Sequence, residues 1–440
     1  MVILKLKANK EFNYKMHHPW GNKDDFEKLS DNFFTNDIVE VRDSKNAFIS
    51  RGYINPKSLI FYRALTFDSR EKLENKQSFL VQRLLQCWLE RRLSGYSTSC
   101  RLCFSENDFL PGLIVDYFKT SHGQVFVLQI LSLGMHNLVS NPLALMEDLV
   151  SRAKVEKLGD VDWENTAVVI RNDSKIREKE GLTVSVPVVL KKSPVINLED
   201  CQILMTHFYL QEPFVMNANL EGGQKTGFFL DQNYNLQRTA EILTQAIKYK
   251  QSCGIPIGTV KILDICCYLG QWSLYFGLLL KKLGVSAEFV LLDVSEEAIN
   301  KAKANLDRYD INYTSLIMDV VEQDFRFEEN SFDLVIVDPP AFIKNKKSIP
   351  TGKHAYQKLN SKALPFIKNN GFMVSCSCSG LLSLNDFKEC LQKTFSRNLV
   401  RAKCLAQGGH APDHPFLVSF PEGYYLKMLL HIVNNKISLN

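Results

Sequence analysis

At 440 residues the chain is longer than one hydrophobic core usually holds, so we expect two or three domains. A hydrophobic content of 45% and a charged content of 23% are typical of a globular protein and argue against a disordered chain. Lys and Arg exceed Asp and Glu by 53 to 48, a mild excess that permits a nucleic-acid partner without requiring one.

The cysteines and the apolar segments indicate the compartment. The eleven cysteines lack the spacing of a disulfide framework, and residues 1–10 alternate apolar and basic types, unlike a signal peptide. No apolar stretch approaches the roughly 18 residues that span a bilayer. We therefore expect a cytoplasmic protein with reduced thiols and no membrane partner. Cys100 and Cys103 form a lone CxxC pair without further ligands at suitable spacing, so we expect no metal site.

The first part of the chain, residues 1–73, consists of short alternating segments separated by turn signals such as Asn55-Pro56. This pattern predicts a small β-rich, barrel-like domain. Residues 74–198 show mixed signals and predict an α+β domain. Helices are expected in it at 79–93 and 142–155, and strands at 109–116, 125–130 and 167–171.

Strand and helix signals alternate from residue 199 to residue 440, which predicts a Rossmann-like α/β domain with a doubly wound parallel sheet. Open sheets of this class bind ligands at the carboxyl ends of their strands. The expected strands are 260–265, 289–292, 315–317, 334–337 and 372–375, and helices between them include 296–309 and 361–368.

Three successive strands of this domain end in acidic residues, namely Asp264, Asp293 and Asp319. The loop after Asp264 carries the single glycine Gly270, so the G-x-G-x-x-G fingerprint of dinucleotide sites is missing. We expect Asp264 to lie near an ammonium group, Asp293 to accept ribose hydroxyls, and Asp319 to meet an adenine amino group. This set favours S-adenosylmethionine over NAD as the cofactor.

The next two strands end in a carboxylate and a thiol. Asp338-Pro339-Pro340-Ala341-Phe342 follows one strand, and Ser377-Cys378-Ser379-Gly380 follows the other. A thiolate can add to an electrophilic ring carbon of a pyrimidine while a nearby acid holds the base. The alternative is a tight strand exit with buried, inert cysteines.

With these motifs the chain resembles the bacterial large-subunit ribosomal RNA cytosine-C5 methyltransferases that carry an N-terminal PUA domain. The resemblance covers nearly the whole chain and implies a PUA-like domain at 1–73, a middle domain at 74–198 and a methyltransferase domain at 199–440. Departures are Gln271 in place of a second glycine and the additional thiol of Cys376. The matching stretches are 51–56, 111–116, 223–232, 264–270, 338–342, 377–380, 413–415 and 421–427.

The resemblance also implies roles for individual residues. Cys378 is expected to attack C6 of cytosine, and Asp338 to bind the exocyclic amine or N3 of the base. Besides the three strand-end aspartates and Gly270, the expected cofactor contacts are Tyr268, Phe229, Asp231 and Gln232. The expected substrate contacts are Lys225, Pro339, Pro340 and Phe342.

Two other functions stay open at this point. A methyltransferase acting on guanine N7 or on a base amine needs no thiol, and Cys378 within Ser-Cys-Ser argues for cytosine instead. A non-catalytic RNA-binding scaffold would be expected to lose the acidic strand ends, which are present. The sequence leaves open the target nucleotide, the choice between naked RNA and an assembled subunit, and the oligomeric state, with a homodimer among the alternatives.

Overall fold

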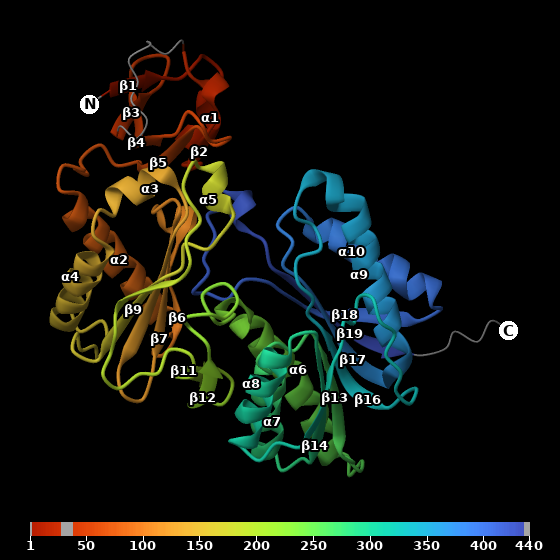
Figure 1. Ribbon diagram of the computed structural model, residues 1–440. Helices are drawn as coiled ribbons and strands as arrows, with labels where there is room; N and C mark the ends of the chain where they lie inside the picture. The colour runs from red at the N-terminus through yellow and green to blue at the C-terminus, as the bar shows by residue number, and fades with distance from the viewer. Residues whose placement is uncertain (1, 28–37, 435–440) are drawn as a thin grey trace. The chain divides into compact units, whose positions relative to one another are not determined.

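The computed structural model describes residues 2–27 and 38–434, so parts of the expected first and last domains lie outside it. The described chain divides into two compact units (Figure 1). The first unit contains residues 1–205, 218–230 and 412–423, and the second contains 206–217, 231–411 and 424–440. Each unit is described by itself.

The first unit begins with a five-stranded sheet of order β1-β3-β4-β5-β2, which confirms the expected β-rich N-terminal region. Its inner face packs a core that includes Leu4, Phe26, Val39 and Tyr62. A Cβ at Gly52 would lie 2.0 Å from the carbonyl oxygen of Arg63, so β4 can approach β5 only with glycine there. The strands are Val2–Lys5 (β1), Trp20–Gly21 (β2), Ile38–Arg42 (β3), Phe48–Ile54 (β4) and Tyr62–Thr66 (β5), and helix α1 is Glu11–Lys15.

A second five-stranded sheet of the first unit has the order β10-β9-β8-β7-β6, and helices α2 and α4 pack side by side next to it (Figure 1). The strand expected over 109–116 begins only at Leu113, because Phe109 has a left-handed backbone (φ 53°) that ends a 3-10 turn. The strands are Cys100–Phe104 (β6), Leu113–Lys119 (β7), Gln124–Ile130 (β8), Thr166–Ile170 (β9) and Val188–Lys191 (β10); the helices are Lys76–Leu93 (α2), Leu133–Leu138 (α3), Pro142–Val155 (α4) and Ile176–Lys179 (α5).

The second unit is built on a seven-stranded sheet of order β15-β14-β13-β16-β17-β19-β18 (Figure 1). The first five strands in that order are parallel, as expected, whereas β19 is antiparallel to both β17 and β18. The C-terminal pair was not predicted, so the sheet is mixed rather than wholly parallel. The strands are Val260–Ile265 (β13), Ala287–Asp293 (β14), Tyr313–Ile317 (β15), Phe332–Val337 (β16), Ile367–Ser377 (β17), Arg401–Gly408 (β18) and Lys427–Asn434 (β19).

Five longer helices accompany this sheet. The helix expected over 361–368 is wrong for its second half: α9 ends at Ala363 and β17 begins at Ile367. A 3-10 turn, Leu364–Phe366, separates the two, and Pro365 within it has no N–H with which to continue the α-helix. The helices are Asn233–Ser252 (α6), Gln271–Lys282 (α7), Glu296–Asp307 (α8), Ile349–Ala363 (α9) and Leu384–Arg397 (α10).

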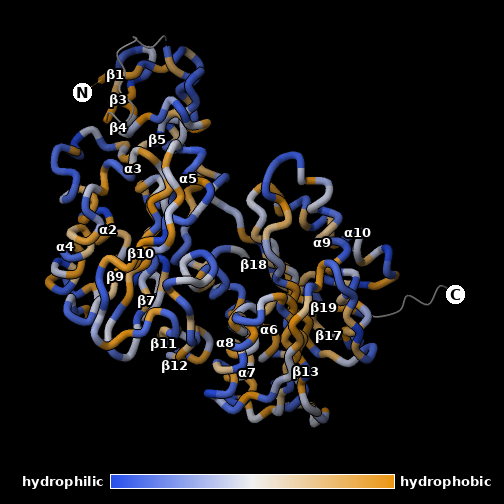
Figure 2. The backbone as a smooth tube through the Cα atoms, in the orientation of Figure 1, coloured by the Kyte–Doolittle hydropathy of each residue, from blue (hydrophilic) through white to orange (hydrophobic). Residues whose placement is uncertain are grey.

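The interior of the second unit is apolar where the strands cross it, as the colouring around β13, β17 and β19 shows in Figure 2. Its core includes Leu263, Val335, Tyr356, Met373 and Phe387. A separate two-stranded sheet pairs Cys201–His207 (β11) with Glu212–Ala218 (β12). In the part of the chain that the structure describes, no helix is both long and apolar enough to cross a membrane.

Candidate active site

The carboxyl ends of β13, β14, β16 and β17 gather the residues on which the predicted chemistry depends. In the parallel register Ile265 of β13 pairs with both Leu292 of β14 and Val337 of β16. The residues that follow these positions, including Asp293 and Asp338, therefore leave the sheet along the same edge. The sequence prediction that strand ends converge is consistent with this topology.

The loop after β13 has an unusual backbone. Cys266, Tyr268 and Gly270 all have positive φ angles, of 65°, 50° and 73°. Asp293 fixes this loop, since its Oδ2 accepts a hydrogen bond from the Tyr268 N–H at 2.9 Å while its Oδ1 accepts from the Ser295 N–H at 2.9 Å. Tyr268, Gly270 and Asp293 are thus parts of one local arrangement.

Gln271, which replaces the second glycine of the family pattern, starts helix α7 directly after this loop. Its side chain is buried, and its Nε2 donates to Oδ1 of Asn233 on α6 at 3.1 Å. Gln271 therefore links two helices, which gives its side chain a structural contact inside the second unit.

Asp264 is fully buried at the end of β13, one residue before the strand's last position. Its Oδ2 accepts a hydrogen bond from Ser273 Oγ at 2.7 Å, whereas its Oδ1 has no partner among residues 2–27 and 38–434. Burial, with smaller contributions from the charges of Asp338 and Asp293, raises the pKa of Asp264 to about 7. An unpaired buried acceptor costs about 1–3 kcal/mol unless a ligand supplies a donor, and the ammonium group of S-adenosylmethionine is such a donor. The residues present therefore fit this cofactor.

Asp319 lies two residues after β15, and its Oδ1 accepts from the N–H groups of Val321 and Glu322 at 3.0 and 3.3 Å. This carboxylate thus shapes the turn that leaves the strand. The structure places it after a strand next to β14, as expected. Its contact with an adenine amino group stays a prediction.

Asp338 follows β16 and is held by two side chains. Its Oδ2 accepts from Gln232 Nε2 at 2.8 Å and from Trp272 Nε1 at 3.0 Å. The expected cofactor contact Gln232 thus touches the expected base-binding residue. Trp272 was not predicted, because nothing in its position on α7 indicates which residue its indole reaches.

The thiol of Cys378 lies just beyond β17 and is partly buried. Its Sγ is 3.9 Å from the carbonyl oxygen of Pro339, so the two strand-end motifs meet here. Cys376 is fully buried, and burial raises the pKa of its thiol well above the usual range, which disfavours its thiolate.

The remaining expected contacts have mixed surroundings. Pro339 is buried and Pro340 is exposed, while the Phe342 ring packs on Tyr356 with a centroid distance of 4.8 Å. Asp231 is buried and accepts a hydrogen bond from the Tyr425 hydroxyl.

Lys225 and Phe229 belong to the first unit and are not part of the arrangement described for the second unit. The Lys225 Nζ lies 4.3 Å from the centroid of the Phe229 ring. Their expected roles in substrate and cofactor binding stay predictions.

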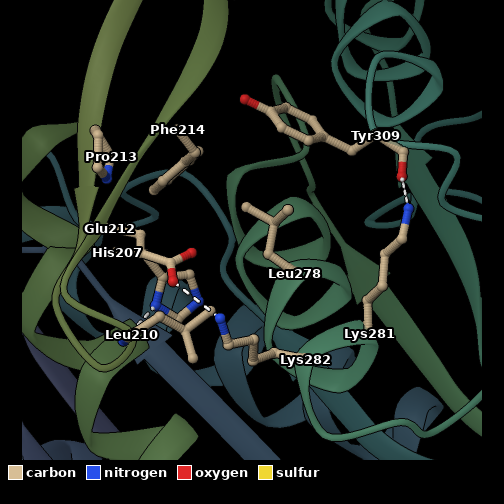
Figure 3. Close-up of a pocket in the computed structure, with 9 residues that line it drawn as sticks. All are labelled: His207, Leu210, Glu212, Pro213, Phe214, Leu278, Lys281, Lys282 and Tyr309. Carbon is tan, nitrogen blue, oxygen red and sulfur yellow. Dashed lines mark hydrogen bonds and ion pairs between the residues drawn. The ribbon is translucent and has the colours of Figure 1, made fainter.

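A cavity of about 330 Å³ lies elsewhere in the second unit, beside β11, β12 and α7 (Figure 3). Its charged groups are already paired: Lys282 Nζ bonds Glu212 at 3.0 Å and Lys281 Nζ bonds the Tyr309 carbonyl at 3.1 Å. None of the strand-end residues lines this cavity, so we do not assign the chemistry to it. In the described ranges of the chain, no group of three or more His, Cys, Asp or Glu residues could hold a metal ion.

Two family models match parts of this chain. Residues 4–67 match the family model of the PUA-like domain, and residues 262–357 match that of a methyltransferase domain. The second match contains Asp264, Asp293 and Asp338. A relative in Yersinia pseudotuberculosis serotype O:1b (strain IP 31758), named ribosomal RNA large subunit methyltransferase I, is 27% identical over 438 residues and covers 97% of this chain and 98% of its own.

Solved structures share the fold over almost the whole chain. A putative SAM-dependent methyltransferase from Streptococcus mutans superposes with a TM-score of 0.71 at 16% identity, over 98% of this chain and 100% of its own. A putative methyltransferase complexed with SAH gives a TM-score of 0.69 at 17% identity, with the same coverage. The expected PUA-like and Rossmann-like folds are therefore confirmed. The chain is an S-adenosylmethionine-dependent methyltransferase with an N-terminal PUA-like domain.

Proposed function

We propose that this enzyme methylates C5 of a cytosine in large-subunit ribosomal RNA through a covalent bond between Cys378 and C6 of the base. The observation that carries the proposal is the contact between the two strand-end motifs, with Cys378 Sγ 3.9 Å from the carbonyl oxygen of Pro339, next to Asp338. The name of the Yersinia relative supports large-subunit ribosomal RNA as the substrate.

In this proposal the carboxylates of the sheet edge hold the cofactor, which supplies a methyl group from its sulfonium. Oδ1 of Asp264 accepts from the ammonium group, and Asp293 accepts from the ribose hydroxyls while it holds the Tyr268 backbone. Asp319 is assigned to the adenine amino group. Asp231 and Gln232 support the site through Tyr425 and Asp338.

The chemistry begins when the Cys378 thiolate forms a bond to C6 and the electron pair of the C5–C6 double bond makes C5 nucleophilic. C5 then takes the methyl group. A base then removes the C5 proton, the C5–C6 double bond forms again, and the S–C6 bond breaks with its electron pair returning to sulfur. We assign Asp338 to the exocyclic amine or N3 of cytosine, and Gln232 and Trp272 orient its carboxylate by donating to Oδ2.

We further propose that residues 1–73 and 74–198 capture the RNA and that residues 199–440 catalyse the reaction. The match of residues 4–67 to the PUA-like domain supports this division. A cytoplasmic location is part of the proposal because bacterial ribosomal RNA is made there. No comparison supports the homodimer, which stays a prediction.

The test uses two cysteine variants and matched cofactor-binding measurements. Cys378→Ala should abolish methyl transfer to ribosomal RNA and leave cofactor affinity unchanged, because the thiol contacts only the base. Cys376→Ala is the control and should keep most of the activity, because Cys376 is buried. An active Cys378→Ala enzyme would overturn the cytosine-C5 assignment in favour of methylation at a nitrogen.

A further inference from the structure

A buried lysine lies next to the motif that carries Cys378. Lys427 is the first residue of β19, its Cα is paired with that of Ser377 at the end of β17, and only 1% of the residue is exposed. Its Nζ donates a hydrogen bond of 2.7 Å to the carbonyl oxygen of Ser379. The Lys427 side chain therefore extends from the level of residue 377 to residue 379, along the part of the chain that contains Cys378.

Buried lysines are usually paired with a carboxylate, whereas Lys427 donates to a backbone carbonyl. Within the described parts of the chain, no carboxylate forms an ion pair with Lys427. Burying an ammonium group without a counter-charge costs several kcal/mol. Burial lowers the pKa of Lys427 to about 8, and the negative charge of a Cys378 thiolate opposes that shift. A thiolate at residue 378 would therefore supply the negative charge that the Lys427 ammonium group lacks in the described chain.

The other titratable groups around the Cys378 motif do not favour ionisation of its thiol. Tyr356 of α9 donates to or accepts from Ser379 Oγ at 2.9 Å, and burial raises the pKa of Tyr356 to about 12, so it is neutral. Asp338, after β16, and Asp231 are anionic neighbours of the adjacent Cys376, whose own thiol is neutral. In this set Lys427 supplies the positive charge.

We propose that the ammonium group of Lys427 stabilises the thiolate of Cys378, which makes Lys427 a positioning residue for the covalent step. The inference rests on the proposed function, because it concerns the nucleophile of that reaction. When the thiol ionises, its proton passes to solvent, the sulfur keeps the electron pair, and Lys427 keeps its own proton. That electron pair forms the S–C6 bond and returns to sulfur when the bond breaks.

The experiment measures ionisation of the thiol without RNA. The rate of alkylation of Cys378 by iodoacetamide is followed by peptide mass spectrometry from pH 5 to pH 10 in wild type, Lys427→Met and Lys427→Arg. A free cysteine titrates near pH 8.5. We expect the wild-type midpoint to lie below that value, and Lys427→Met to raise it by about one unit or more, which slows alkylation at pH 7 about tenfold. Lys427→Arg should stay close to wild type because it keeps the charge.

Two controls separate charge from folding. Cys253 is exposed, so its alkylation profile should be the same in all three proteins, and cofactor affinity should be unchanged. An unchanged Cys378 profile in Lys427→Met would overturn the proposal. If that variant does not fold, the thiolate absorbance of wild type minus that of Cys378→Ala decides, and a midpoint at or above about 8.5 overturns the proposal. A Cys378→Ala enzyme that still methylates RNA would refute the proposed function but not the effect of Lys427 on the thiol.

Discussion

Both units contain buried charged residues, but the partners of these residues differ. In the first unit they are arginines, and in the second unit they lie at the carboxyl ends of the parallel strands. Arg91 lies with both terminal nitrogens on Asp108, at 3.0 and 2.5 Å. Arg101 makes a similar two-point contact with Asp116, at 2.7 and 2.9 Å. Arg63 is held by Glu180 at 2.6 Å.

At the sheet edge of the second unit, Asp264 keeps one oxygen without a partner in the described chain, and Lys427 has a backbone carbonyl in place of a carboxylate. Most buried polar groups in proteins are satisfied by the fold itself, so exceptions call for an explanation. Each of these buried arginines is thus paired with a carboxylate of the first unit, whereas Asp264 and Lys427 of the second unit have no oppositely charged partner in the described chain. Groups of the second kind are the ones expected to meet a ligand or a reacting group.

Breaking a paired charge should have the largest effect on stability. Arg91→Met leaves Asp108 buried without its partner, so we expect a loss of about 3–5 kcal/mol in unfolding free energy. Urea denaturation measures this loss. The matched control is Arg70→Met, whose ion pair with Asp68 is exposed to solvent and should contribute little to stability. Equal effects of the two variants would contradict the comparison.

Changing an incompletely paired group should affect the ligand more than the fold. Asp264→Asn removes the anion facing the cofactor's ammonium group and should weaken S-adenosylmethionine binding by about 1.5–3 kcal/mol in calorimetry. The control is Asp333→Asn. Asp333 lies near the start of β16, away from the carboxyl ends of the strands, so its replacement should leave cofactor affinity unchanged. An Asp264→Asn protein with wild-type affinity would refute the assigned contact.

The same variant has a consequence for pH dependence. The pKa of Asp264 is about 7 in the folded protein and lies near 4 in an unfolded chain, so the folded state holds a proton that the unfolded state releases. Its contribution to the stability of the cofactor-free protein is present below pH 4 and is lost as pH rises to about 7. Asp264→Asn should lose this decline, and an unchanged pH profile in urea denaturation would contradict the assigned pKa.

The smallest effect concerns Gln271. Because its amide bonds Asn233 of α6, Gln271→Ala should lower unfolding free energy by about 1 kcal/mol and leave cofactor affinity unchanged. Thermal unfolding and calorimetry measure the two quantities. Weaker cofactor binding without a loss of stability would instead place Gln271 in the cofactor pocket.

The sequence could predict the parallel strands and their acidic ends because apolar runs such as 334–337 are followed directly by polar residues. It could not predict β18, because residues 401–405 are largely exposed and show no strand-like apolar run. Because neither β18 nor β19 was predicted, the pairing of Lys427 with Ser377 could not be predicted either. The indole of Trp272 reaches Asp338 only through tertiary packing, which local periodicity does not encode.

The central claim is that Cys378 forms a bond with cytosine C6, and trapping that adduct tests it most directly. Ribosomal RNA containing 5-fluorocytosine should form a covalent complex with the wild-type enzyme and cofactor, because fluorine at C5 does not leave as a proton and the S–C6 bond persists. Peptide mass spectrometry should place the modified base on Cys378. Absence of an adduct with RNA that the enzyme otherwise methylates, or an adduct on Cys376, would contradict the account.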